Sequence, residues 1–136
     1  MGESLGYALI QIAHNFGAVA VLGGAVCALS PVRRVQPGAR GIAWLVLAGW
    51  LVQITSGVAF GVASFIYYGR LPDIHGVAVA ALLIKIGCAI SGAALSVVYL
   101  KRQALWSGRQ RTATWTALAT LAAIALSAAA LLRWFS

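Results

Sequence analysis

Acidic residues are almost missing from this sequence. Only two of the 136 residues are acidic, Glu3 and Asp73, and charged residues of both signs make up 9% of the chain. Hydrophobic residues make up 62%. A soluble domain of this length has too little interior to bury so much apolar surface. The composition therefore excludes a soluble globular protein and predicts a protein whose solvent is lipid.

The motifs of several catalytic and metal sites are also missing. The sequence has no HExxH, no CxxC, no glycine-rich phosphate loop and no close pair of carboxylates, which disfavours a hydrolase. Met1 is the only methionine, so a copper path built from thioethers would lack its usual soft ligands. Cys27 and Cys88 are the only cysteines, and their expected depths in two helices differ, which argues against a disulfide.

Four long apolar segments are present, at residues 5–30, 41–68, 74–100 and 113–135. Each is long enough to cross a hydrocarbon layer about 30 Å thick, which takes a helix of about 20 residues. The pattern predicts an all-α fold, a single integral membrane four-helix bundle covering residues 1–136. The first segment lacks a basic start and a small-residue cleavage site, so we interpret it as a permanent helix and not a signal peptide.

The formal net charge of +8 is concentrated between segments. The positive-inside rule predicts that these basic loops are cytoplasmic, with both termini on the outer (periplasmic) side of a bacterial inner membrane. The loops are expected to lie against anionic lipid head groups, and nothing in their placement favours a nucleic-acid partner. The basic residues in question are Arg33, Arg34 and Arg40 in the first loop and Lys101, Arg102, Arg109 and Arg111 in the last.

Lys85 and His14 are polar residues placed deep in the apolar segments. A cation at mid-bilayer costs about 2.5–3.5 kcal/mol, so such a residue normally faces protein or a water-filled cavity and marks a functional site. At 1.5 Å per residue, Lys85 lies about 15 Å and His14 about 13 Å from the outer ends of their helices. The matching depths predict that the two residues meet.

Lys85 has no evident counter-charge in the sequence. Both acidic residues are expected near the outer surface, and snorkelling to an interface would need a longer stem than a mid-helix lysine offers. Lys85 is then either neutral through desolvation or paired with a group outside the sequence. A haem or porphyrin propionate, a quinone oxygen, or a carboxylate of a partner subunit would each serve.

The two histidines each have a structural and a functional interpretation. His14 is either a neutral imidazole bonded to Gln53, Asn15 or a backbone carbonyl, or a haem or metal ligand that also handles protons. Its place in a membrane helix favours the functional interpretation. His75 is either an exposed residue at a helix start or a second metal ligand. Because His75 and His14 differ in depth by about 10 Å or more, a bis-histidine site within one chain would need strong tilting.

The second segment contributes further polar candidates. Gln53, Thr55 and Ser56 lie at a depth that suits the same cavity, although such side chains most often satisfy helix carbonyls or bridge helices. Trp50 is deep enough to flank a flat cofactor. The alanine-rich fourth segment carries few polar residues and is expected to close the bundle or to contact another subunit.

Together, these motifs resemble a known group of membrane proteins. The residues on which the resemblance rests are the first-segment run His14-Asn-Phe-Gly-Ala-Val-Ala-Val-Leu-Gly-Gly, the second-segment run Trp50-Leu-Val-Gln-Ile-Thr-Ser-Gly57, the short Leu71-Pro72 loop and Lys85. Over its first hundred residues the chain is similar to HemJ-type protoporphyrinogen oxidases and CopD-type copper-resistance proteins. The resemblance implies that His14 and Lys85 are the functional pair and that haem b is the cofactor. The loop after the first segment lacks the family's further histidine and aromatic residues, which favours a haem or porphyrin pocket over the oxidase activity itself.

Three functional hypotheses follow. The first is a membrane redox protein with haem b or a porphyrin in the bundle, for electron transfer or porphyrinogen oxidation. The second is a non-catalytic subunit of a larger membrane complex or a homo-oligomer, and the third is copper or proton transport. For the first we predict Lys85 as the catalytic residue, metal ligation by His14 and His75, and cofactor contacts from His14, Lys85, Gln53, Thr55 and Trp50.

Overall fold

The chain folds into four long helices. The computed structural model describes residues 2–30, 39–69 and 75–135. Each helix is long and apolar enough to cross a membrane, which confirms the all-helical architecture and indicates a multi-pass membrane protein. The elements are α1 (Gly2–Leu29), α3 (Ala39–Tyr68), α4 (Val77–Arg102), the short 3-10 helix η1 (Gln103–Leu105) and α5 (Gly108–Phe135).

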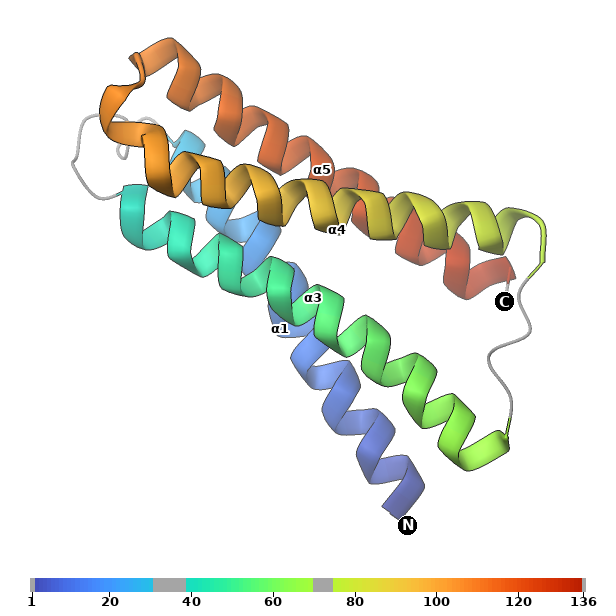
Figure 1. Cartoon of the computed structure of the whole chain (residues 1–136). Helices are drawn as coiled ribbons and strands as arrows, with labels where there is room; N and C mark the ends of the chain where they lie inside the picture. The colour runs from blue at the N-terminus through green and yellow to red at the C-terminus, as the bar shows by residue number, and fades with distance from the viewer. Residues whose placement is uncertain (1, 31–38, 70–74, 136) are drawn as a thin grey trace.

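The helices form two hairpins that lie against each other (Figure 1). α1 packs along α3 and α4 packs along α5, and the hairpins touch mainly through α3 with α4 and α1 with α5. The hairpins lie close together at one end and diverge at the other (Figure 1). We call the first end the basic end, because it holds Arg40, Lys101, Arg102, Arg109 and Arg111, and the second the splayed end, which holds Tyr7, Tyr67 and His75.

The apolar core lies in the half of the molecule nearer the basic end. Small side chains allow the helices to approach closely there, as is common where membrane helices pack. A Cβ at Gly24 would collide with Val46, and a Cβ at Gly49 would lie 3.0 Å from the backbone oxygen of Gly17. The buried cluster consists of Val21, Ala25, Ala28, Ala43, Val46, Trp50, Ala89, Tyr99, Trp115, Leu118 and Ala122.

Trp50 is the side chain that joins the two hairpins in this core. Its indole is 1% exposed. It lies directly against Gly92 of α4, where a Cβ would overlap the ring. The hairpins can therefore pack at this point because a glycine faces a tryptophan, and the spacing between α3 and α4 follows from that pair.

All four helix starts differ from the predicted boundaries, and a local cause is visible for α4 and α5. α4 begins at Val77 and not at residue 74, because Gly76 takes a positive φ of 53° that breaks the helical path. α5 begins at Gly108 and not at 113. Ser107 and Gln110 form a reciprocal capping box there, with Ser107 N donating to Gln110 Oε1 (2.9 Å) and Gln110 N to Ser107 Oγ (3.3 Å).

The helix bounds correct the placement of five basic residues that were expected in loops. Arg109 and Arg111 lie in the first turns of α5. Arg40 lies in the first turn of α3, and Lys101 and Arg102 lie in the last turn of α4. All five remain at the basic end. Arg33, Arg34 and Asp73 lie outside the described residues. Cys27 and Cys88 are both free thiols, as their predicted depths suggested.

The pairing of Trp50 with Gly92 yields a stability prediction. We expect Gly92→Ala to lower the free energy of unfolding by about 1–3 kcal/mol, the usual cost of overpacking, because the rigid indole has to move. Gly87→Ala is the matched control, because Gly87 lies on the same helix, α4, and a Cβ there meets nothing within 4 Å. Unfolding of both variants in mixed micelles of increasing SDS fraction measures the difference, and equal stabilities would contradict this packing.

Candidate functional site

His14 and Lys85 meet where the two hairpins face each other. His14 lies halfway along α1 and Lys85 lies in the first half of α4. Lys85 Nζ is 2.9 Å from His14 Nε2, although the residues are 71 positions apart in the chain. Both side chains are half-buried. The contact expected from their matching depths is therefore present.

Ser56 of α3 holds the other side of the imidazole. His14 Nδ1 lies 2.6 Å from Ser56 Oγ. Ser56 is 6% exposed, and its hydroxyl also donates to the backbone oxygen of Val52, one turn earlier in α3, at 2.5 Å. Three helices thus contribute side chains to one site, which we call the polar cluster and define as His14, Gln53, Ser56 and Lys85.

Counting donors assigns the direction of each hydrogen bond in the polar cluster. A serine hydroxyl carries one proton, and here it is used on the Val52 carbonyl. Ser56 Oγ must then accept from His14, so the imidazole proton is assigned to Nδ1. Nε2 is left with its lone pair, and it accepts from Lys85. The hydrogen bonds therefore all point the same way: Lys85 donates to His14, His14 donates to Ser56, and Ser56 donates to the backbone oxygen of Val52.

Gln53 fixes the backbone of α1 beneath the imidazole. Its Nε2 donates to the backbone oxygen of His14 at 2.5 Å. The amide reaches that oxygen over Gly17, where a Cβ would lie only 3.0 Å from Gln53 Nε2. The glycine therefore has a specific use, because it gives the interhelical amide room to reach α1.

Aromatic rings cover the polar cluster on the side of the splayed end. Phe60 meets the His14 ring edge-on, with centroids 5.9 Å apart. Tyr7 stacks on Phe60 at 6.3 Å and also contacts Tyr67 at 6.0 Å. These rings belong to α1 and α3, so they bind that hairpin together beyond the reach of the apolar core.

Lys85 has no carboxylate partner in the part of the chain that the structure describes. The two acidic residues are Glu3 and Asp73, and neither side chain is among those described. Glu3 lies eleven residues before His14, about 16 Å along α1. A neutral imidazole satisfies one of the N–H groups of a lysine but does not compensate a charge.

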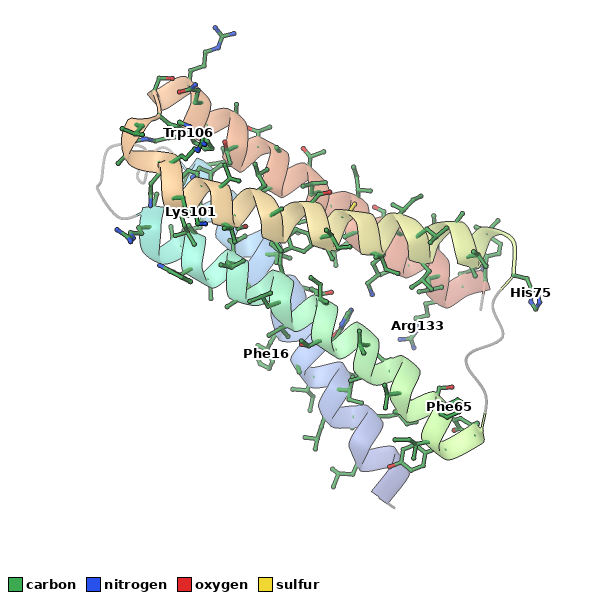
Figure 2. The ribbon with its side chains drawn as sticks, in the orientation of Figure 1. Phe16, Phe65, His75, Lys101, Trp106 and Arg133 are labelled. Atoms are coloured by element: carbon green, nitrogen blue, oxygen red, sulfur yellow. The ribbon has the colours of Figure 1, made fainter. Side chains whose placement is uncertain are left out.

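Three of the predicted site residues lie outside the polar cluster. Thr55 is exposed and donates to the backbone oxygen of Leu51 at 2.9 Å. Trp50 packs on Gly92, and its buried Nε1 has no hydrogen-bond partner among the described residues. His75 lies just before α4 and points away from the bundle at the splayed end (Figure 2). Cofactor contacts from Thr55 and Trp50, and ligation by His75, stay predictions.

Ser56 is the cluster member that the sequence-based list of site residues left out in favour of Thr55. Helical geometry explains the difference. Residues three apart share a face of a helix, so Ser56 lies on the face of Gln53. Thr55 follows Gln53 by two positions and lies on nearly the opposite face. The spacing thus pairs Ser56 with Gln53, and the contact of Gln53 with α1 in the structure shows that this shared face meets His14.

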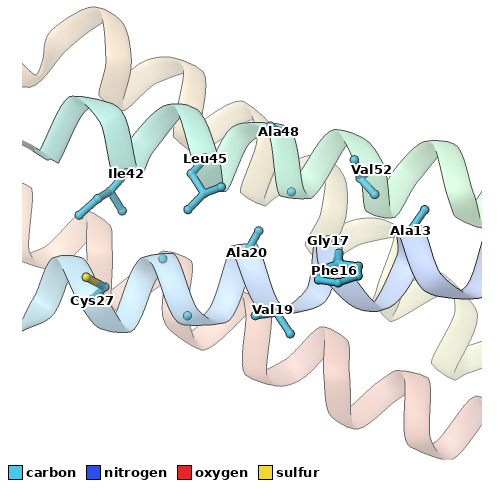
Figure 3. A pocket seen from close by; sticks show the side chains of 13 residues that line it. Ala13, Phe16, Gly17, Val19, Ala20, Cys27, Ile42, Leu45, Ala48 and Val52 are labelled. Atoms are coloured by element: carbon cyan, nitrogen blue, oxygen red, sulfur yellow. The ribbon is translucent and has the colours of Figure 1, made fainter.

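An apolar groove lies on the face of the α1–α3 hairpin that carries exposed side chains (Figure 3). Its volume is about 640 Å³, and none of the side chains of the polar cluster line it. It is therefore a separate feature of the molecule, shaped by small residues. The lining consists of Ala13, Phe16, Gly17, Val19, Ala20, Gly23, Gly24, Cys27, Ile42, Leu45, Ala48, Gly49 and Val52.

The bridge from Gln53 to α1 leads to a second stability prediction. Gln53→Leu removes an interhelical hydrogen bond, so we expect it to lower the free energy of unfolding by about 0.6 kcal/mol, and at most about 1.7 kcal/mol. Thr55→Val is the matched control, because the Thr55 hydroxyl bonds only carbonyls of its own helix. SDS titration measures both, and a larger loss in Thr55→Val would refute the bridging role.

Comparison with known proteins leaves the family of this chain open. No family model matches it, and neither a curated protein nor a solved structure is similar enough to be matched to it.

Proposed function

We propose that this chain is a membrane redox protein that binds a b-type haem or a porphyrin in its helix bundle, for electron transfer or porphyrinogen oxidation. The observation that carries the proposal is the contact between His14 and Lys85 in the middle of apolar helices. A histidine and a lysine at such depth usually mark a functional site. In helix bundles, cofactor sites are built from side chains on facing helices.

The donor set of the polar cluster suits a haem better than a bare metal ion. Within residues 2–30, 39–69 and 75–135, no group of three or more His, Cys, Asp or Glu side chains is placed to hold a metal. A haem needs only an axial ligand from the protein, and imidazole is a usual one. His14 also has the hydrogen bond on its second nitrogen that orients most metal-ligating histidines.

Lys85 would supply a positive charge close to the propionate groups of a haem held by His14. His14 Nε2 would be the atom that holds the iron, and the flexible stem of Lys85 would allow its amine to move off that lone pair. A porphyrin propionate would then give Lys85 the carboxylate that the described side chains lack. A bound haem would supply one-electron chemistry through its iron.

An absorption spectrum tests this proposal directly. We expect the full-length protein, purified from cells supplied with haem precursors, to show a Soret band and to yield haem b in a pyridine extract. His14→Ala should lose the band, because it removes the proposed axial ligand. Lys85→Ala should weaken haem retention while leaving ligation possible. His75→Ala is the matched control, since His75 is the only other histidine and lies outside the polar cluster.

A protein that purifies without a Soret band under these conditions would overturn the proposal, as would a His14→Ala spectrum identical to that of the wild type.

The apolar groove on α1 and α3 favours a second candidate function, that of a non-catalytic subunit. Small residues of this kind let a helix of another subunit pack closely. Haem-free protein that elutes with a stoichiometric partner in mild detergent would support that function.

The distribution of charge supports a proposed orientation in a bacterial inner membrane. Five described cations gather at the basic end, namely Arg40, Lys101, Arg102, Arg109 and Arg111, whereas the far end of α5 carries only Arg133. The positive-inside rule makes the basic end cytoplasmic. Both termini then lie on the periplasmic side.

Reporter fusions check the orientation. We expect alkaline phosphatase fused after Ser136 to be active, because the enzyme folds only outside the cytoplasm. Green fluorescent protein at the same point should stay dark. The same reporters inserted after Ser107, at the basic end, provide the control and should give the reverse result. A fluorescent C-terminal fusion would contradict the orientation.

A further inference from the structure

The polar cluster contains a serine, Ser56, that belongs neither to the predicted site residues nor to the proposed ligand set. Ser56 is nearly fully buried and lies on α3, the helix opposite Lys85 across the imidazole. Its hydrogen bond to the ring of His14 is made at Nδ1. That contact leaves the nitrogen proposed as the ligand untouched, so Ser56 acts on His14 from the far side of the ring.

We infer that Ser56 is a positioning residue, which holds His14 in the Nδ1–H tautomer and so presents the Nε2 lone pair to Lys85 of α4. The argument rests on the single proton of the serine. Its hydroxyl lies 2.5 Å from the Val52 oxygen and 3.4 Å from the Gln53 oxygen, both carbonyls of its own helix. With the proton committed to a carbonyl, Oγ faces the ring only as an acceptor.

The helical backbone keeps the proton of Ser56 on the Val52 carbonyl. Serine in a helix readily donates to the carbonyl one turn earlier, and at a buried position no water competes for that proton. Turning the hydroxyl toward the ring would leave two oxygens 2.5 Å apart with no proton between them. The Nε2–H tautomer is therefore penalised at Ser56 as well as at Lys85, which would meet an N–H instead of a lone pair.

The same direction of donors closes one route for protons. A proton that reaches Ser56 has no onward acceptor except helix carbonyls of Val52 and Gln53, which cannot pass it on. Proton exchange at His14 is thus confined to Nε2 and Lys85. This geometry gives the imidazole one reactive nitrogen and argues against a relay that continues through Ser56.

Nuclear magnetic resonance of the imidazole nitrogens tests the inference without any cofactor. His75→Asn leaves His14 as the only histidine, so ¹⁵N-histidine labelling gives one pair of ring signals in nanodiscs at pH 8. We expect a protonated Nδ1 and an unprotonated Nε2. Finding the Nε2–H form in this protein, or protons on both nitrogens, would overturn the inference.

Further variants separate the serine from the lysine, since both favour the same tautomer. In Lys85→Met the Nδ1–H form should persist, because Ser56 still accepts. In Lys85→Met combined with Ser56→Ala the Nε2–H form should become the major one. Ser56→Thr should restore Nδ1–H in the lysine-free protein, because threonine can make the same carbonyl bond. Loss of Nδ1–H in Lys85→Met alone, or its survival as the major form in the double variant Lys85→Met with Ser56→Ala, would refute the role of Ser56.

The value of this tautomer to a bound haem depends on the proposed function, but the resonance experiment does not. If haem binds, Ser56→Ala should weaken its retention about 10–100-fold, the usual effect of removing the partner of a ligating histidine, and Ser56→Thr should recover it. Protein with the Nδ1–H form but no Soret band would refute only the proposed function. Protein with a Soret band and unchanged retention in Ser56→Ala would refute only the positioning role.

Discussion

The proposed function of this chain rests on one interaction, the hydrogen bond between Lys85 and His14. It joins the two hairpins at a point where no described side chain carries a negative charge. Both residues would be costly in lipid if they stood alone. By facing each other they satisfy part of their hydrogen-bonding need inside the protein.

The surrounding packing holds that contact in place. Gln53 and Ser56 fix the backbone and the ring of His14 from α3, and Gly17 gives the amide of Gln53 room to do so. Farther along the bundle, the indole of Trp50 fills the space at Gly92 and determines how closely α4 approaches. Along each of the three helices, the polar cluster thus lies on the splayed-end side of the buried apolar cluster.

Much of the architecture follows from one-dimensional patterns. Helix number and approximate span come from four apolar runs, because only a helix satisfies its own backbone in lipid. The depth of a residue also follows from a constant rise, so the meeting of His14 and Lys85 was predictable. The start of α5 was missed because a capping box formed by Ser107 and Gln110 is a local polar signal, which hydropathy alone does not detect.

By itself, the sequence determined that four apolar helices form and that Lys85 has no acid at its own depth, because both are matters of composition and linear spacing. The rotation of each helix about its axis was decided only by the tertiary structure. That rotation places Ser56 and not Thr55 beside the imidazole, 2.6 Å from its Nδ1. Its physical basis is side-chain packing between helices, such as Trp50 on Gly92, which no pattern within a single helix encodes.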